Sequence, residues 1–298
     1  MVAEELGRAL APVPFFSSVF LAIEVIKLAG TEQQQAQLLP DLADGSKIAT
    51  LGAWEINGPL HAGNVNMSYI DGLLTGEKIL VPDGDIADSI VLIAKEGEDF
   101  SLFHVNLSQV GVTRKTMDTI DPSRNFSSIE FSDVVATRLG SAGEGWALLN
   151  KVMDRAAVLV AFEQLGGAQK ALDMAVAYAQ ERFAFGRPIG SFQAVKHMLA
   201  NMYVDLELAR SNCYYGAWAL STDAAELPLA AATARVSATN AYQHCAKNNI
   251  QAHGGMGFTW EFDCHLHYRR SNTLALILGG PSVWKDKLVD QLETLEVA

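Results

Sequence analysis

Two segments of the chain combine residue types that can bind an anion. The first, at residues 181–197, reads ERFAFGRPIGSFQAVKH and contains Arg182 and Gln193. Arg182 falls near the expected end of one helix, where a cation is favoured, and its guanidinium can grip a phosphate through two hydrogen bonds. Gln193 falls in the expected first turn of the next helix, beside free backbone N–H groups. The segment therefore predicts an anion clamp, although its Gly186 and Pro188 also fit a simple helix stop.

The second segment is rich in glycine. It reads NNIQAHGGMGFTWE at residues 248–261 and places Gly254, Gly255 and Gly257 close together. Because glycine has no side chain, the backbone here can approach a ligand closely; the simpler alternative is a glycine that ends a helix. Neither segment is specific by itself, but the presence of both in one chain favours a ligand-binding role.

Composition and charge narrow the class of protein. Of the 298 residues, 49% are hydrophobic, which excludes a disordered chain. Acidic side chains outnumber basic ones 34 to 22, and the net charge of -12 argues against nucleic-acid binding. No uncharged apolar run reaches the roughly 20 residues of a membrane span. Three cysteines, and a start (MVAEELGRAL) without the pattern of a signal peptide, predict a reducing, cytoplasmic location.

The elements that must position the two segments change in character along the chain. Residues 1–47 have helical patterning, with an apolar face that stops at Gly30 and then a short helix that Thr31 caps and Pro40 ends. Residues 48–140 carry short runs of β-forming residues between turn residues, typical of a small antiparallel β domain.

Residues 141–298 are rich in alanine and predict long helices. Ser191 is expected to cap the second of these helices, and Pro228 fits the first turn of the third. Long helices with apolar stripes predict a four-helix bundle. The predicted fold class is therefore mostly α with a central β domain. The core of the bundle is expected to include the aromatic residues of the second helix, Tyr214, Tyr215 and Trp218. The helices are expected at about residues 146–182, 191–220, 228–252, 265–278 and 281–295.

The two segments resemble motifs of the acyl-CoA dehydrogenase family, R-x-x-F-G-x-x-I-x-x-F-Q and Q-x-x-G-G-x-G. The resemblance extends over nearly the whole chain and includes EINGPLHAGNV, which is similar to the family's E-P-x-A-G-S-D. It implies a helical domain (here reduced in length), a β domain and a four-helix domain, assembled as a tetramer. It also implies FAD as cofactor and oxidation of an acyl-CoA thioester between its α and β carbons. The residues that match the two motifs are Arg182, Phe185, Gly186, Ile189, Phe192 and Gln193, then Gln251, Gly254, Gly255 and Gly257.

The chain departs from the family where the flavin ring is held. In the family, the flavin ring is contacted by a Thr or Ser just before the Glu of the E-P-x-A-G-S-D motif. It is also contacted by a Trp-x-Thr or Trp-x-Ser pair slightly later in the chain. The match places Trp54 at the first position and Leu80 and Pro82 at the pair. Leucine offers the flavin no polar group, and proline lacks even its backbone N–H. The resemblance therefore implies that the ring contacts are lost.

The chain also departs from the family at the catalytic base. The usual Glu lies before Gly-Thr near the C-terminus, where this chain has Leu278, and the alternative Glu position matches Ala156. Neither side chain can abstract a proton. Glu163 and Asp263 remain as candidate bases, although each has a simpler structural explanation: Glu163 as a polar residue hydrogen-bonded between helices, and Asp263 as a solvated helix start or a partner for Arg269.

The residues that family members lend to the FAD of a neighbouring subunit are kept. They are Arg182, Phe185, Gln193, Gln251, Gly254 and Gly255. This pattern predicts a subunit of a heteromeric, α2β2-type acyl-CoA dehydrogenase whose homologous partner holds the base and the ring pocket. It resembles the split enzymes of actinobacterial sterol side-chain breakdown, which implies a bulky acyl-CoA, with an electron-transfer flavoprotein as acceptor. The alternatives are a homotetramer with a displaced base at Glu163 or Asp263, and a non-catalytic scaffold subunit.

Other chemistry has less support. Asp263, Cys264, His265 and His267 are metal-ligand types, but two histidines two positions apart point in different directions on a helix, so no metal site is expected. Cys213 and Cys245 lie in apolar helical runs and are expected in the core. His61 and His244 have no matched Ser or Cys, so a nucleophilic triad is not expected either.

Overall fold

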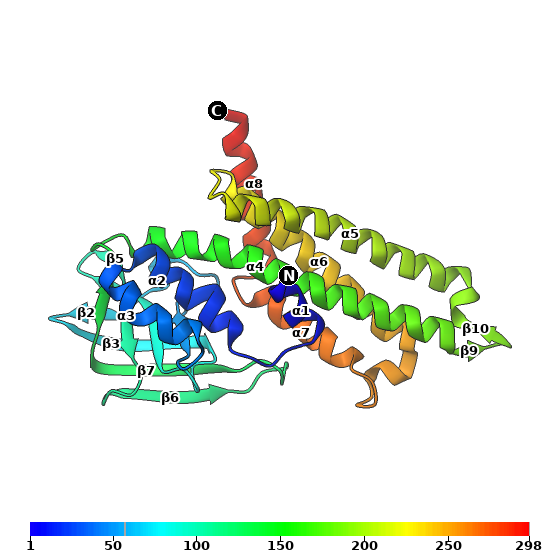
Figure 1. Cartoon of the computed structure of the whole chain (residues 1–298), viewed down its shortest axis with the longest axis horizontal. Helices are drawn as coiled ribbons and strands as arrows, with labels where there is room; N and C mark the ends of the chain where they lie inside the picture. Colours follow the sequence, from blue (N-terminus) through cyan, green and yellow to red (C-terminus); the bar gives the residue numbers. More distant parts are fainter. Residues whose placement is uncertain (57, 298) are drawn as a thin grey trace. The chain divides into compact units, whose positions relative to one another are not determined.

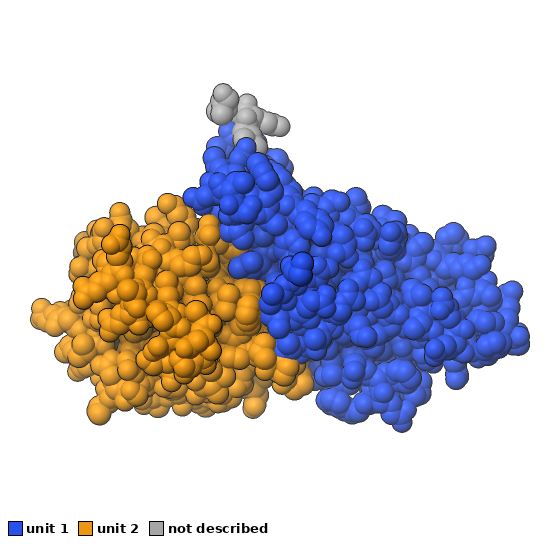
Figure 2. Space-filling view, in the orientation of Figure 1, with its two compact units in different colours: residues 1–11, 157–298 blue, residues 12–156 orange. Residues whose placement is uncertain are grey.

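The structure is a computed structural model and describes residues 1–56 and 58–297. Short helices come first in the chain, then the strands of a sheet, then long helices, which is the predicted order (Figure 1). By contacts the chain forms two units, residues 12–156 and residues 1–11 with 157–298 (Figure 2). The predicted domain boundaries after residues 47 and 140 rest on the change in sequence pattern alone and stay a prediction. Among the described residues, no helix is both long and apolar enough to cross a membrane.

The helices of the first unit begin with η1 (Phe16–Ala22, a π-helix), followed by α2 (Ile23–Ala29) and α3 (Glu32–Ala43). The predicted cap of α3 is confirmed: Gln34 N–H donates to Thr31 Oγ1 (3.2 Å) and Thr31 N–H donates to Gln34 Oε1 (2.9 Å). This is a capping box, which satisfies two backbone donors at once. The prediction that Pro40 ends the helix was wrong, because α3 continues to Ala43 with Pro40 inside it.

The sheet of this unit has the strand order β6-β7-β3-β2-β4-β5-β8, with β1 paired to β4. Most pairs are antiparallel, as expected, but β1 runs parallel to β4 and a single β2–β4 pair is also parallel, so the sheet is mixed. Parallel strands need a long connection, and the chain between β1 and β4, which includes β2 and β3, is long enough to provide it. The hydrophobic core of the sheet contains Ile90, Leu92, Phe103, Ile129 and Phe131. The strands are β1 (Ala49–Gly52), β2 (Ser68–Ile70), β3 (Leu73–Pro82), β4 (Ser89–Glu96), β5 (Asp99–Asn106), β6 (Val112–Met117), β7 (Phe126–Val135) and β8 (Thr137–Leu139), with the short helix η2 (Ala62–Asn64) before β2.

The second unit is helical, and its long helices match the predicted ones. Pro228 lies in the first turn of its helix as expected. Ser191 does not cap its helix: the hydroxyl donates to Pro188 O (2.7 Å), and the next helix starts after Phe192 without a side-chain cap. The helices are α1 (Val2–Arg8), α4 (Gly145–Glu181, whose residues to 156 count with the sheet), α5 (Gln193–Ser221), α6 (Leu227–His253), α7 (Cys264–Leu276) and α8 (Pro281–Val297); between them lie β9 (Phe183–Ala184), β10 (Arg187–Pro188), η3 (Ile189–Ser191) and η4 (Gly254–Phe258).

Helix α6 is the centre of this unit and packs against α5, α7 and α8. The side of α5 that is buried carries small residues, Cys213, Gly216 and Ala219. The prediction that its aromatic residues lie in the core was wrong for Tyr214 and Trp218, which are 58% and 48% exposed, while Tyr215 is half-buried. Small side chains allow two helices to approach closely, so they occupy the contact and the aromatic residues take the opposite face.

Helix α1 crosses α4 at two glycines. A Cβ atom at Gly7 would lie 1.8 Å from the backbone oxygen of Glu163, and one at Gly166 would lie 1.8 Å from that of Glu4. Two ion pairs hold the same helix: Arg8 contacts Asp173 (3.0 Å), and Glu4 contacts Arg210 on α5 (2.8 Å). The crossing therefore requires glycine on both helices.

We predict that Gly166→Ala lowers the free energy of unfolding by about 2 kcal/mol, because the added methyl group must displace the α1 backbone. Lys170→Ala, an exposed change one turn later, is the control and is expected to alter stability by less than about 0.5 kcal/mol. Urea unfolding followed by circular dichroism measures both. Equal stability of the two variants would contradict the close crossing.

Candidate functional site

The structure brings the two motif segments together at one end of the helical unit. Tyr178, one turn before Arg182 on α4, stacks on His253 at the end of α6, with ring centroids 4.1 Å apart and planes 24° apart. Phe262 lies edge-on to both rings, at 5.9 Å from Tyr178 and 5.3 Å from His253. Since His253 directly precedes Gly254, the glycine segment lies beside the end of α4, from which the β9–β10 hairpin projects (Figure 1).

The hairpin displays Phe185 at a conformational cost. Ala184 pairs with Arg187 across a two-residue turn, in which Phe185 has φ +55° and Gly186 has φ +80°. The left-handed conformation costs a residue other than glycine about 1–2 kcal/mol, and Asn or Asp is preferred at the first position of such a turn. The turn between β2 and β3 follows that preference with Asp71 and Gly72. Phe185 does not, and its side chain is 95% exposed, so neither turn geometry nor burial explains a phenylalanine there.

Arg182 is fixed through its backbone and leaves its side chain available. Its N–H donates to Tyr178 O and its own O accepts from Ile189 N–H, each at 2.8 Å. The guanidinium is exposed, and within residues 1–56 and 58–297 no carboxylate or carbonyl accepts from it. Gln193 is the first residue of α5 and is also exposed. An unpaired guanidinium at this end is suited to binding an anion.

The glycines divide into two kinds. At Gly254, which has φ +59°, and at Gly255 a Cβ atom would meet nothing within 4 Å, so both face open space. At Gly257 a Cβ would lie 2.9 Å from Ile250 O, so this glycine serves packing. Gln251 is exposed in the last turn of α6. Gly254 and Gly255 therefore leave accessible backbone beside Gln251, as a ligand approaching closely requires.

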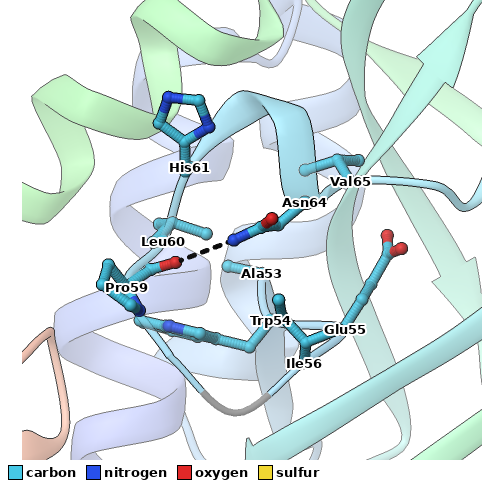
Figure 3. Close-up of a pocket in the computed structure, with 9 residues that line it drawn as sticks. All are labelled: Ala53, Trp54, Glu55, Ile56, Pro59, Leu60, His61, Asn64 and Val65. Carbon is cyan, nitrogen blue, oxygen red and sulfur yellow. Dashed lines mark hydrogen bonds between the residues drawn. The ribbon is translucent and has the colours of Figure 1, made fainter.

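Trp54, Leu80 and Pro82 lie near one another in the sheet unit. Ile79 N–H donates to Trp54 O (2.8 Å), and Leu80 has φ +52° in a bulge of β3. Trp54 borders a small hollow of about 180 Å³, open solvent included, which Ile56, Leu60 and Val65 also line (Figure 3). In Figure 3 its indole and the Glu55 carboxylate point in opposite directions. These residues offer apolar surface in place of hydroxyl groups.

Glu55 is engaged in holding the sheet together. Its carboxylate accepts from the ammonium of Lys78 (2.6 Å) and from the backbone N–H of Asn66 (2.6 Å). Lys78 is fully buried, and burial lowers its pKa to about 8, with Glu55 opposing the shift. A carboxylate with these partners is structural.

The positions of the family's base are apolar and buried. Leu278 is 4% exposed and Ala156 is fully buried. Glu163 is buried and forms an ion pair with Arg270 on α7 (3.0 Å). Asp263 is exposed at the start of α7 and makes no side-chain cap bond. The structure therefore gives Glu163 a charged partner within the bundle and leaves Asp263 open to solvent.

Sequence analysis missed a buried polar network next to Glu163. Arg235, fully buried on α6, donates to Gln164 Oε1 and to Leu274 O, and burial lowers its pKa to about 9. On the same helix, the Tyr242 hydroxyl contacts His267 Nδ1 (3.0 Å), and burial lowers the pKa of His267 to about 4. The available signal was polar residues at helical spacing on the otherwise apolar, alanine-rich α6.

The remaining candidates behave as inert groups. The three cysteines are unpaired and buried, as predicted for Cys213 and Cys245, and burial raises the pKa of each of these two to about 12. Within the described part of the chain, no three His, Cys, Asp or Glu side chains are grouped as metal ligands.

Comparison with known proteins agrees with this arrangement. The family model "Acyl-CoA dehydrogenase, N-terminal domain" matches residues 1–46, and "Acyl-CoA dehydrogenase, C-terminal domain" matches residues 143–287. Acyl-CoA dehydrogenase IpdE2 of Mycobacterium tuberculosis is 34% identical over 283 residues, which are 94% of this chain and 73% of the relative. Butyryl-CoA dehydrogenase of Megasphaera elsdenii has a TM-score of 0.92 at 25% identity, covering 97% of this chain and 80% of that one. A variant of the steroid ACAD Tcur3481-Tcur3483 has a TM-score of 0.88 at 28% identity, covering 100% and 81%.

We predict that Glu163→Gln lowers the free energy of unfolding by about 3 kcal/mol, because it removes a counter-charge from the buried Arg270. The double variant with Arg270→Gln is expected to recover part of the loss, since no buried charge of this pair remains. Urea unfolding of both variants and the native chain measures the coupling. Unchanged stability together with loss of dehydrogenation would instead identify Glu163 as the base.

Proposed function

The chain belongs to the acyl-CoA dehydrogenase family, and we propose that it acts there as a subunit that lends residues to an FAD site centred on a homologous catalytic partner. The observation that carries the proposal is a contrast between two sets of positions. Those expected to contact a neighbour's cofactor are displayed outward, and in Phe185 at a conformational cost. Those expected to serve the chain's own active site carry buried or apolar side chains, as Leu278 and Ala156 do.

The exposed residues fit the pyrophosphate and adenosine part of FAD. Arg182 would bind the pyrophosphate, whose two negative charges a chain of net charge -12 can accept only at a local cation. Gly254 and Gly255, with open space beside them, would let the backbone approach the same group. Phe185, Gln193 and Gln251 would contact the adenosine side. Bound FAD supplies the hydride acceptor for α,β-desaturation of an acyl-CoA thioester.

Removal of the α proton requires a carboxylate that can accept it. Leucine and alanine at the two family positions cannot do so, and protonation of Glu163 would take a counter-charge from Arg270. Asp263 is open to solvent, whereas the reaction must exclude water. We therefore assign the base, and the polar contacts to the flavin ring, to the partner subunit, in an α2β2 assembly.

The relatives suggest the substrate class. One similar structure is described as a steroid ACAD, and we infer a bulky, steroid-derived acyl-CoA as substrate rather than a short fatty acyl-CoA. An electron-transfer flavoprotein is the expected electron acceptor. Three buried, unpaired cysteines support a reducing compartment such as the cytoplasm.

Expression of the chain alone and with a homologous dehydrogenase subunit tests the proposal. We expect the pair to co-purify with one FAD per heterodimer and to oxidise acyl-CoA, and the single chain to be colourless and inactive. Arg182→Ala in the pair should weaken FAD binding about 10-fold or more, because a charged hydrogen-bond donor is lost. Bound flavin is measured by its visible absorbance. Yellow, active protein from this chain alone would overturn the helper role, and a stable pair whose FAD content ignores Arg182 would favour a scaffold.

A second prediction distinguishes a role of Phe185 in FAD binding from a role in stability. Phe185→Asn should stabilise the helical unit by up to about 1 kcal/mol, because asparagine tolerates the left-handed conformation. The same change should weaken FAD binding in the assembled protein. Asp71→Asn, in the matching turn between β2 and β3, is the control and should change neither. A Phe185→Asn variant that binds FAD normally would show that Phe185 does not contact the cofactor.

A further inference from the structure

Arg187, across the hairpin from Ala184, has no assigned role and an unusual environment. Its guanidinium carbon lies 4.0 Å from the centroid of the Phe192 ring, and its side chain is otherwise exposed. Within residues 1–56 and 58–297, no carboxylate or carbonyl accepts a hydrogen bond from it. Other arginines in this acidic chain find carboxylates, as Arg8 does with Asp173 and Arg155 with Glu24.

The register of the hairpin places Arg187 on the same face as Arg182. Ala184 pairs with Arg187, and Ile189 N–H donates to Arg182 O (2.8 Å), which extends the register by one further pair on each strand. Directly opposed residues share a face and alternate residues along a strand share it too. Arg182 and Arg187 are therefore diagonal neighbours, roughly 7–8 Å apart at the backbone, and their long side chains can converge on one group.

The local sequence is basic. Apart from Glu181, which directly precedes Arg182, residues 181–204 contain no Asp or Glu, and they contain three cations, Arg182, Arg187 and Lys196. The cation–π contact holds the Arg187 guanidinium over the Phe192 ring and uses none of its N–H donors. Phe192 is itself edge-on to Phe185, at 6.2 Å between centroids. The guanidinium is thus oriented in advance beside the residues expected to contact FAD, which reduces the entropy lost on binding.

We propose that Arg187 and Arg182 form a two-arginine fork that binds the two phosphates of the FAD pyrophosphate. This inference rests on the FAD site proposed above and adds a second binding residue to it. Each guanidinium would bind one phosphate group, and Phe192 holds the Arg187 guanidinium through its ring.

FAD binding to the assembled protein, measured by titration of the cofactor-depleted form, tests the fork. Arg187→Gln should weaken binding about 10-fold, and Arg8→Gln, which removes the same charge where it is paired with Asp173, should leave it unchanged. Arg187→Lys should give an intermediate loss, because it keeps the charge without the planar donors. Phe192→Leu should give a smaller loss, because the guanidinium remains but is no longer held. The thermal midpoint of each variant shows whether it is folded.

Two further measurements identify the group that is bound. Added salt should weaken binding less in Arg187→Gln than in the native protein, since one charge contact is already absent. ADP, used as a competitor, should lose affinity for Arg187→Gln by the same factor as FAD. If FAD weakens and ADP does not, Arg187 does not bind the pyrophosphate and the fork is wrong.

The outcomes for the fork and for the proposed function differ. If Arg182→Gln weakens FAD binding and Arg187→Gln behaves as Arg8→Gln does, the fork is overturned while the FAD site stands. If the assembled native protein binds no FAD, or Arg182→Gln has no effect, the proposed site fails and the fork fails with it.

Discussion

The stack of Tyr178 on His253 is the contact on which the candidate site depends. It joins the ends of two long helices from distant parts of the sequence, and so places Arg182 and Gly254 on one side of the unit. His253 is suited to this contact because its Nδ1–H donates to Asn249 O (2.9 Å), which fixes the ring, and because burial lowers its pKa, which favours the neutral form. Gly190 supports the same junction, since a Cβ there would lie 2.9 Å from Ala179 O.

Buried ion pairs show how the chain uses its carboxylates. In the sheet unit Lys78 is fully buried against Glu55, and in the helical unit Arg270 is fully buried against Glu163. A buried cation without its counter-charge is strongly destabilising, so each glutamate has a structural duty that opposes any change of charge during a reaction. This structural role makes Glu163 a poor replacement for the family's catalytic base.

Features with a local cause could be predicted from the sequence, and features with a distant cause could not. The helix cap at Thr31 and the helix start at Pro228 follow from neighbouring residues and were confirmed. The exposure of Tyr214 depends instead on α6, because small residues on the other side of α5 pack there and turn the aromatic residue outward. The parallel β1–β4 pair likewise depends on a strand that comes much later in the chain.

The candidate site shows the same division. Residue types and spacing were enough to single out Arg182, Gln193 and the glycines, and the resemblance to the family's motifs added Phe185. The conformational cost could be seen only in the structure. Phe185 has the same left-handed backbone conformation that Asp71 adopts in the β2–β3 turn, where an aspartate tolerates it better. The conformational energy at Phe185 is not needed for the turn and is not offset by burial in the core, so another interaction must offset it. A ligand or partner that covers this ring, which is 95% exposed, would provide that interaction. The cost at Phe185 therefore favours the proposed contact with another molecule at this end of the helical unit, whereas Leu278, in the turn between α7 and α8, and Ala156, on α4, are simply buried.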